Sequence, residues 1–181
     1  LAQIRLLARM LARGVDRMTA TLAADAGRWS MIALREGSDV EPAYGLALDI
    51  GTTTVAGVLV DLGTGDVVRK AARYNQQLSI ADDIAARISA AKSEPDIERL
   101  RKKLVSDTIN PIIASLCHTQ GIAHEDICRI SIAGHTVMVH LLLGLPVANI
   151  GRVPFNHVIR HLGSVTAAQI DRTWARLSDA Y

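Results

Sequence analysis

The chain is poor in aromatic residues, which make up 3% of its 181 positions. Its hydrophobic fraction is nonetheless 49%, so the interior has to be built from Leu, Ile, Val and Ala. This apolar content is enough for one ordinary domain core, or for one domain and part of another. The first residue is leucine, and we therefore expect the chain to be a fragment of a longer protein.

Cysteine is also scarce. Cys117 and Cys128 form neither a Cys-x-x-Cys pair nor part of a four-ligand set. Iron–sulfur clusters are held by cysteine thiolates, so this stretch of chain has no means of holding one in that way. We expect both thiols to be buried and unpaired, because free cysteine behaves as a small core hydrophobe.

Neither a strong charge imbalance nor a long apolar run is present. Lys and Arg number 20 against 18 Asp and Glu, without a basic tract interleaved with aromatics, which argues against nucleic-acid binding. The most apolar stretch, residues 137–150, contains Gly144 and Pro146 and is too short to cross a bilayer. The N-terminus lacks a signal-peptide pattern, so we expect a cytoplasmic protein with no membrane contact.

The most informative motif is the run Asp-Ile-Gly-Thr-Thr-Thr at residues 49–54. It joins two apolar, β-prone stretches, residues 44–48 and 55–60. Two such stretches with a short Gly/Thr connection predict a hairpin whose tip carries an acid and several hydroxyl groups. A tip of this kind is suited to bind phosphate.

Each residue type in this tip has a chemical reason. Gly51 lets the backbone approach an anion or adopt a positive φ. Consecutive amides and the hydroxyls of Thr52, Thr53 and Thr54 can donate to phosphate oxygens. Asp49 can hold a hydrated Mg²⁺. We therefore predict a phosphate-binding site at Asp49, Gly51 and residues 52–54, with Mg²⁺ at Asp49.

The alternative interpretation of the motif is an ordinary polar hairpin turn. A second acid, Asp61, follows the second strand of the hairpin and favours the phosphate interpretation over the plain turn.

The rest of the chain predicts a mixed α/β order. A breaker-rich stretch at residues 36–43 divides it, so we expect the end of a small α+β linking module at 1–40, a main unit at 44–155 and a C-terminal helix or tail at 156–181. From residue 45 the expected order is β-β-β-α-α-β-α, beginning with an antiparallel meander. Helices are expected at 1–11, 137–143 and 166–177, strands at 67–74 and 127–133, and a hairpin at 17–23 and 28–35. A further helix is expected to begin at Ser79, with Asp82 completing its capping box. Another is expected from Ser93 to Gly121, disrupted by Pro111 near Asn110.

This order, with Asp-x-Gly-Thr-Thr at the first hairpin, resembles the first half of the superfamily of actin, sugar kinases and heat-shock-chaperone ATPases. The resemblance implies a ribonuclease-H-like, actin-like ATPase half-domain whose first hairpin grips the β- and γ-phosphates of ATP. Residues 133–144, Ala-Gly-His-Thr-Val-Met-Val-His-Leu-Leu-Leu-Gly, look like a segment of the reductive activators of corrinoid proteins. His135 stands where that family usually carries Asn.

The resemblance to the corrinoid activators implies a function. An ATP-dependent iron–sulfur protein would return a corrinoid cofactor from Co(II) to Co(I), with the electron supplied through a [2Fe-2S] domain upstream of this chain. The implied partners are a corrinoid protein or corrinoid-dependent methyltransferase, an electron donor and a second copy in a homodimer. The superfamily's second phosphate loop is absent, so we expect the chain by itself to bind nucleotide weakly or not at all.

Two other functions stay open. A sugar or small-molecule kinase of the same superfamily is one, although such kinases often carry Lys shortly after the loop, where this chain has Ala56. A non-catalytic nucleotide-binding scaffold is the other.

Three smaller clusters have simpler explanations. His157 and His161 have the spacing of metal ligands on a helix but lack a third ligand, and a basic patch is the alternative. The Arg-Lys-Lys run at residues 101–103 is expected on a solvated helix face, and His140 in a packed helix interior.

Overall fold

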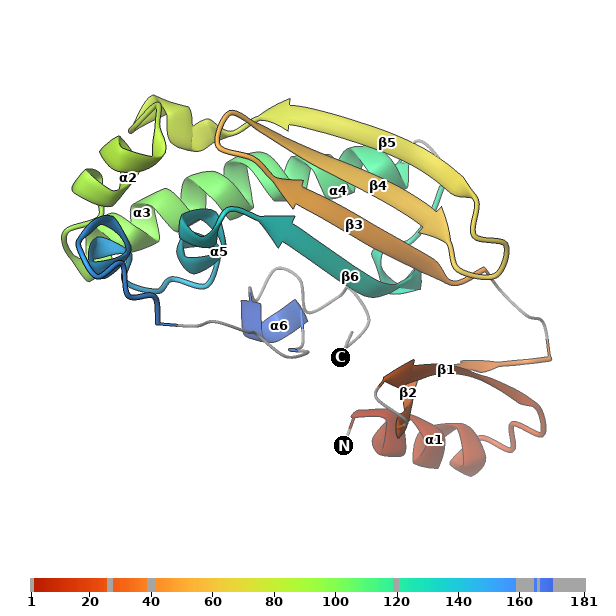
Figure 1. Cartoon of the computed structure of the whole chain (residues 1–181). Coiled ribbons are helices and arrows are strands. Elements are labelled where there is room, and N and C mark those ends of the chain that lie inside the picture. Colours follow the sequence, from red (N-terminus) through yellow and green to blue (C-terminus); the bar gives the residue numbers. More distant parts are fainter. Residues whose placement is uncertain are drawn as a thin grey trace.

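The computed structural model describes residues 2–25, 28–38, 42–118, 121–158, 165 and 167–170. A small N-terminal module comes first, and Figure 1 shows it beside a larger layered unit. It contains helix α1 (Ala2–Ala12) and the antiparallel strands β1 (Met18–Asp25) and β2 (Arg28–Glu36). The predicted helix and hairpin are confirmed, whereas the division into domains stays a prediction.

Polar contacts between described residues connect this module to the larger unit. Arg35 of β2 forms a partly buried ion pair with Asp126. Arg129 donates through Nη1 to the carbonyl oxygen of Ala24 at 3.3 Å. The module therefore meets the larger unit at the residues around the start of one strand, Ile127–Gly134.

The larger unit is built on a four-stranded sheet (Figure 1). Its strands are β3 (Tyr44–Ile50), β4 (Thr54–Asp61), β5 (Val67–Tyr74) and β6 (Ile127–Gly134). The order across the sheet is β5-β4-β3-β6, with the first three antiparallel and β6 parallel to β3. The predicted hairpin and meander are thus confirmed, in a mixed α/β fold.

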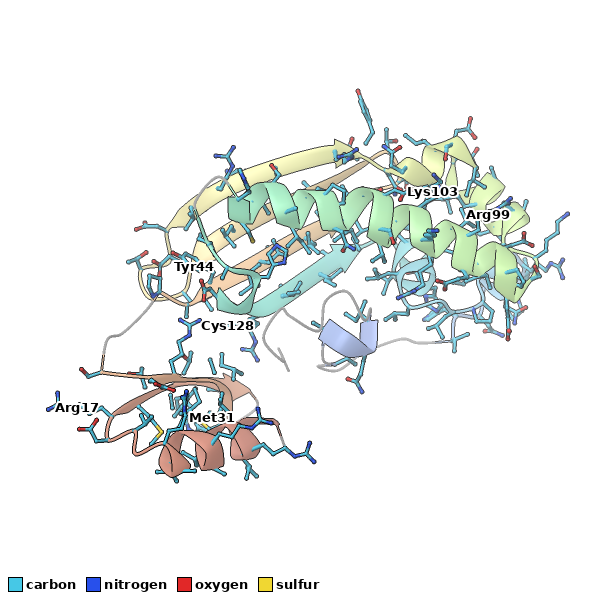
Figure 2. The ribbon with its side chains drawn as sticks, turned by 180° about the vertical axis from the view of Figure 1, so that it is seen from behind. Arg17, Met31, Tyr44, Arg99, Lys103 and Cys128 are labelled. Carbon is cyan, nitrogen blue, oxygen red and sulfur yellow. The ribbon has the colours of Figure 1, made fainter. Side chains whose placement is uncertain are left out.

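A long, interrupted helix covers one face of the sheet. It consists of α3 (Glu94–Leu104), a π-helical turn (Val105–Ile109) and α4 (Asn110–His118). Figure 2, seen from behind, shows this helix lying across the strands, with Lys103 on its length. Gly57 of β4 admits the helix closely, because a Cβ there would lie 2.8 Å from Cγ2 of Ile112.

The core lies between that helix and the sheet. Alternate residues of β3 are buried, which is the pattern of a strand with one covered face. The buried residues of this cluster are Leu46, Leu48, Ile50, Val55, Leu59, Leu104, Val105, Ile109, Ile112, Ile113, Leu116, Cys117, Ile127, Met138, Leu142 and Ala167. As predicted, Cys117 and also Cys128 are buried, and neither forms a disulfide.

The disruption expected near Asn110 takes the form of the π-helical turn. Pro111 has no N–H, and its ring crowds the carbonyl group of the preceding turn in a regular α-helix. The wide turn directly before it relieves that crowding. Thr108 accompanies the turn, because its buried hydroxyl donates to the carbonyl oxygen of Lys103 at 2.8 Å.

The helix predicted from Ser79 is wrong in its start. Residues Gln76–Ser79 form a 3₁₀ turn, and α2 (Ile84–Ala90) begins after Asp83, whose Oδ1 accepts the Ala86 N–H at 2.6 Å. Ser79 instead donates to the carbonyl of Gln76. Asn75 and Gln77, which are buried on either side of Gln76, favour the tighter turn, because Oδ1 of Asn75 accepts the Gln77 N–H at 3.0 Å.

Among the described residues after β6, two segments form α-helices. They are α5 (Thr136–Leu142), as predicted, and the short α6 (Ala167–Ile170), which falls within the helix predicted at 166–177. The other residues of that predicted helix lie outside the described residues. Within the described part of the chain, none of the helices has the length and apolar character needed to span a bilayer. The cytoplasmic location stays a prediction.

Candidate functional site

The predicted phosphate loop forms the turn between β3 and β4. Asp49 is paired with Ala56 on β4 and with Ala133 on β6. Its side chain is exposed between two buried neighbours, Leu48 and Ile50. Asp49 therefore projects from the sheet face opposite the helical layer, next to the turn.

Gly51 is required by space at this turn. A Cβ on Gly51 would lie 2.3 Å from the carbonyl oxygen of Thr54, closer than any real side chain comes. Gly51 is not among the described glycines with a positive φ, so the positive φ that we considered from the sequence is not adopted. The close backbone approach is the part of the expectation that the structure shows.

Three consecutive carbonyl groups of the loop accept hydrogen bonds from residues later in the chain. The carbonyl of Gly51 accepts from Nδ2 of Asn75 at 3.0 Å, and that of Thr53 accepts from the Asn75 N–H at 2.8 Å. Between them, the carbonyl of Thr52 accepts from Nη2 of Arg87 at 2.7 Å. Two residues thus fix the orientation of three successive peptide groups.

The amides of the loop consequently face the other way. In a trans peptide the carbonyl group and the following N–H point in opposite directions. The described cis bond is Val153–Pro154, so the loop peptides are trans. The N–H groups of Thr52, Thr53 and Thr54 therefore each point away from the donor, Asn75 or Arg87, that holds the carbonyl of the same peptide.

The residues that hold the loop, Asn75 and Arg87, are both fully buried. Arg87 also donates through Nε to the carbonyl of Ala81 at 3.1 Å and through Nη1 to Sδ of Met138 at 3.2 Å. Burial lowers the pKa of the guanidinium, and the nearby carboxylate of Asp82, with that of Asp83, counteracts this. Sequence reasoning missed both residues, since an isolated Asn and a helical Arg carry no local signal.

Asp61 does not belong to this site. It is paired with Tyr44, at the opposite end of the β3–β4 hairpin from Asp49. Its Oδ1 accepts the N–H of Gly63 at 2.7 Å and that of Thr64 at 3.3 Å, which shapes the turn into β5. Asp61 therefore contributes no group to the loop, and the phosphate interpretation stays a prediction.

The start of α5 lies at the same end of the sheet as the loop (Figure 1). Gly134 is paired with Ile50, and His135 is the N-cap residue of α5. The Val137 N–H donates to Nδ1 of His135 at 3.2 Å. Histidine thereby performs the capping that Asn performs at many helix starts, which accounts for the departure from the corrinoid-activator motif. His140 is buried, as predicted, and donates from Nδ1 to the Thr136 carbonyl at 2.8 Å.

The other predicted clusters have different outcomes. His157 is described but His161 lies outside the described residues, and the described residues hold no group of three or more metal-type ligands. In the basic run, Lys102 is exposed and Lys103 pairs with Asp107 at 2.8 Å. Arg101 departs from the expected solvated face, because its Nε donates to the Leu142 carbonyl at 3.0 Å, at the end of α5.

Comparison with known proteins identifies the family. The profile of the RACo middle region matches residues 44–179. The corrinoid activation enzyme RamQ of Eubacterium limosum is 32% identical over 115 residues, which are 64% of this chain and 19% of that protein. A solved structure of a reductive activator for a corrinoid, iron-sulfur protein superposes with a TM-score of 0.83 at 32% identity, covering 94% of this chain and 27% of the other.

The chain thus spans about a fifth to a quarter of the length of these relatives. The family match covers well over half of the chain, including the loop, the helical layer and α5. The chain belongs to the RACo middle region family.

Proposed function

We propose that this chain is part of an ATP-dependent reductive activator that returns a corrinoid cofactor from Co(II) to Co(I). We further propose that residues 44–155 form the first half of an actin-like, ribonuclease-H-like ATPase domain. The observation that carries both proposals is the loop in which Asn75 and Arg87 hold three carbonyls and turn three amides outward beside Asp49. The two relatives, a corrinoid activation enzyme and a reductive activator for a corrinoid, iron-sulfur protein, support the first proposal.

The residues present fit a nucleotide phosphate with its metal ion. The amides of residues 52–54 and their hydroxyls would donate to phosphate oxygens, and Gly51 keeps the backbone free of side-chain bulk. The exposed carboxylate of Asp49 is the oxygen ligand type that hydrated Mg²⁺ prefers. A bound Mg²⁺ would neutralise phosphate charge at this position.

The residues present do not fit an iron–sulfur cluster. Cys117 and Cys128 are the chain's two cysteines, and both are buried, one in α4 and one in β6. A [2Fe-2S] cluster needs four ligands, mostly thiolates. We therefore propose that the electron reaches the corrinoid from a cluster in another domain of the full-length protein.

The proposed partners are a corrinoid protein or a corrinoid-dependent methyltransferase, together with an electron donor. Reduction of Co(II) to Co(I) consumes one electron and is unfavourable for ordinary donors. Nucleotide binding can favour it if the nucleotide states differ in their affinity for the partner. The ATP loop would then act on the partner's conformation, while the cluster supplies the electron.

The test is reactivation by the full-length protein carrying Asp49→Asn. Co(I) formation is followed by the absorbance of the corrinoid partner with and without ATP, and reduction of the cluster is measured separately. We expect ATP-dependent Co(I) formation to be abolished while cluster reduction stays normal. Unchanged ATP turnover in the variant would overturn the proposal.

The kinase and scaffold alternatives stay predictions. Phosphoryl transfer to an added sugar or acid would favour the kinase. ATP binding without phosphate release would favour the scaffold.

A further inference from the structure

We propose that Asn75 and Arg87, together named the loop clamp, are positioning residues that orient the amides of residues 52–54 toward a bound phosphate. The inference rests on the proposed function, because it requires a nucleotide phosphate at the loop. It adds two residues that lie outside the Asp-x-Gly-Thr-Thr motif and reach the loop from behind.

The first step is the cost of placing Arg87 where it lies. Its side chain is fully buried, and its described partners are two carbonyl oxygens and a thioether sulfur. Burying a charge without a carboxylate in contact is costly. The shortest of these hydrogen bonds, at 2.7 Å, goes to Thr52 in the loop. The free-energy cost of burying Arg87 is explained if its charge is needed to hold the Thr52 carbonyl.

The second step is what the charge does to the loop peptide. A hydrogen bond from an ionised donor is stronger than one between neutral groups. It also polarises the peptide that accepts it, so the N–H at the other end becomes a better donor. Arg87 holds the carbonyl of Thr52, and the N–H of that same peptide belongs to Thr53. The amide at the centre of the loop is therefore both oriented and strengthened.

The third step is the field behind the loop. The carboxylates of Asp82 and Asp83 act on Arg87 through space and favour its charged form against the desolvation. The charge of Arg87 lies on the carbonyl side of the Thr52–Thr53 peptide and favours an anion on the N–H side, an effect that the carboxylates of Asp82 and Asp83 reduce. Arg87 thus contributes to phosphate binding without touching the phosphate.

The fourth step is the rigidity of the second residue. Asn75 reaches the loop with both its side-chain amide and its backbone N–H, so it holds the carbonyls of Gly51 and Thr53 together. Its Oδ1 accepts the Gln77 N–H at 3.0 Å, and Nε2 of Gln77 donates to the Leu100 carbonyl in α3 at 3.0 Å. Asn75 is therefore held in position by hydrogen bonds that lead to α3, which keeps the loop carbonyls in a fixed orientation.

The test compares three variants of the full-length protein. Arg87→Met keeps most of the side-chain volume but removes the charge and the donors, and Arg87→Lys restores one cationic donor. Arg101→Met is the matched control, because Arg101 also donates to a backbone carbonyl, that of Leu142, away from the loop. Dissociation constants of a non-hydrolysable ATP analogue and of AMP are measured by calorimetry, with thermal unfolding as a check of the fold.

For Arg87→Met we expect affinity for the ATP analogue to fall roughly tenfold or more, a change of about 1.4 kcal/mol. Affinity for AMP, which lacks the phosphates at the loop, should stay within about twofold of wild type on the same scale. Arg87→Lys should recover part of the loss, and Arg101→Met should show none. A merely structural role would lower both affinities together and leave their ratio unchanged, which would overturn the inference.

The outcomes separate the two proposals. A wild-type protein that binds no ATP analogue would overturn the proposed function. A wild-type protein that binds it, with an Arg87→Met variant that unfolds normally and binds equally well, would overturn only the clamp. If Arg87→Met does not fold, Asn75→Asp replaces it, since this change keeps Oδ1 for Gln77 but removes the donor to Gly51. Undiminished binding of the analogue by Asn75→Asp would likewise overturn the clamp.

Discussion

The hydroxyl of Thr108 accepts the backbone N–H of Gln76 at 3.0 Å. Gln76 directly follows the clamp residue Asn75, and Thr108 lies in the π-helical turn of the long helix. The same hydroxyl donates to Lys103, so one buried oxygen serves as donor and acceptor. The widened turn and the segment next to the predicted phosphate loop are thus joined through the Thr108 side chain.

Thr108→Val should destabilise the protein by about 1–3 kcal/mol, because the isosteric change removes both hydrogen bonds of the buried hydroxyl. Thr108→Ser keeps the hydroxyl and should lose less. Urea unfolding measures both. Equal midpoints for Thr108→Val and wild type would show that the hydrogen bonds of this hydroxyl contribute nothing to stability.

Asp49→Asn should leave the unfolding free energy within about 0.5 kcal/mol of wild type, because the side chain is exposed. ATP hydrolysis by the full-length protein should nevertheless be lost. Asp61→Asn is the matched control at the other end of the same hairpin, where an amide oxygen can still accept from Gly63. Loss of hydrolysis in both variants would contradict a specific role for Asp49.

Gly51→Ala should cost about 1–3 kcal/mol, since the added methyl group collides with the Thr54 carbonyl and the turn has to shift. Phosphate binding should be lost along with stability, so this variant does not by itself report on binding. Thr53→Ala separates the two effects. The Thr53 side chain is exposed, and its removal should weaken ATP binding while thermal unfolding stays unchanged.

His135→Ala should destabilise the protein by about 1 kcal/mol through loss of the N-cap of α5. His135→Asn should match wild type, because an Asn oxygen can accept the Val137 N–H in place of Nδ1. Chemical unfolding of the three proteins measures the difference. A stability for His135→Asn as low as that of His135→Ala would contradict the capping role.

The hairpin and the core were predictable from the sequence because their signals are local. In β3, buried Leu46, Leu48 and Ile50 alternate with exposed Ala47 and Asp49, and period-two alternation is what identifies a strand with one covered face. The loop residues lie between two such strands, so their position followed directly. The thiols also behaved as small hydrophobic residues.

The clamp was not predictable, because its partners are carbonyl groups far along the chain. Arg87 sits on a helix between Ile84 and Ile88, where an exposed arginine would give the same pattern. The sequence position of Asp61 also gave no indication of where it lies in the hairpin. Its place after an apolar strand looks like that of Asp49, but antiparallel pairing puts the two acids at opposite ends. Strand register and long-range hydrogen bonds depend on the tertiary structure, so residue spacing alone does not predict them.

The parallel pairing of β3 with β6 also bears on how the chain is made. β3, β4 and β5 leave the ribosome in succession and can pair at once, whereas β6 follows the entire helical layer. Such long-range pairing is slow, because a large loop has to close before the contact forms. Met138, which contacts Arg87, arrives later still. A nascent chain halted after α4 would hold the loop sequence but present an unpaired edge of β3, the kind of edge that templates aggregation.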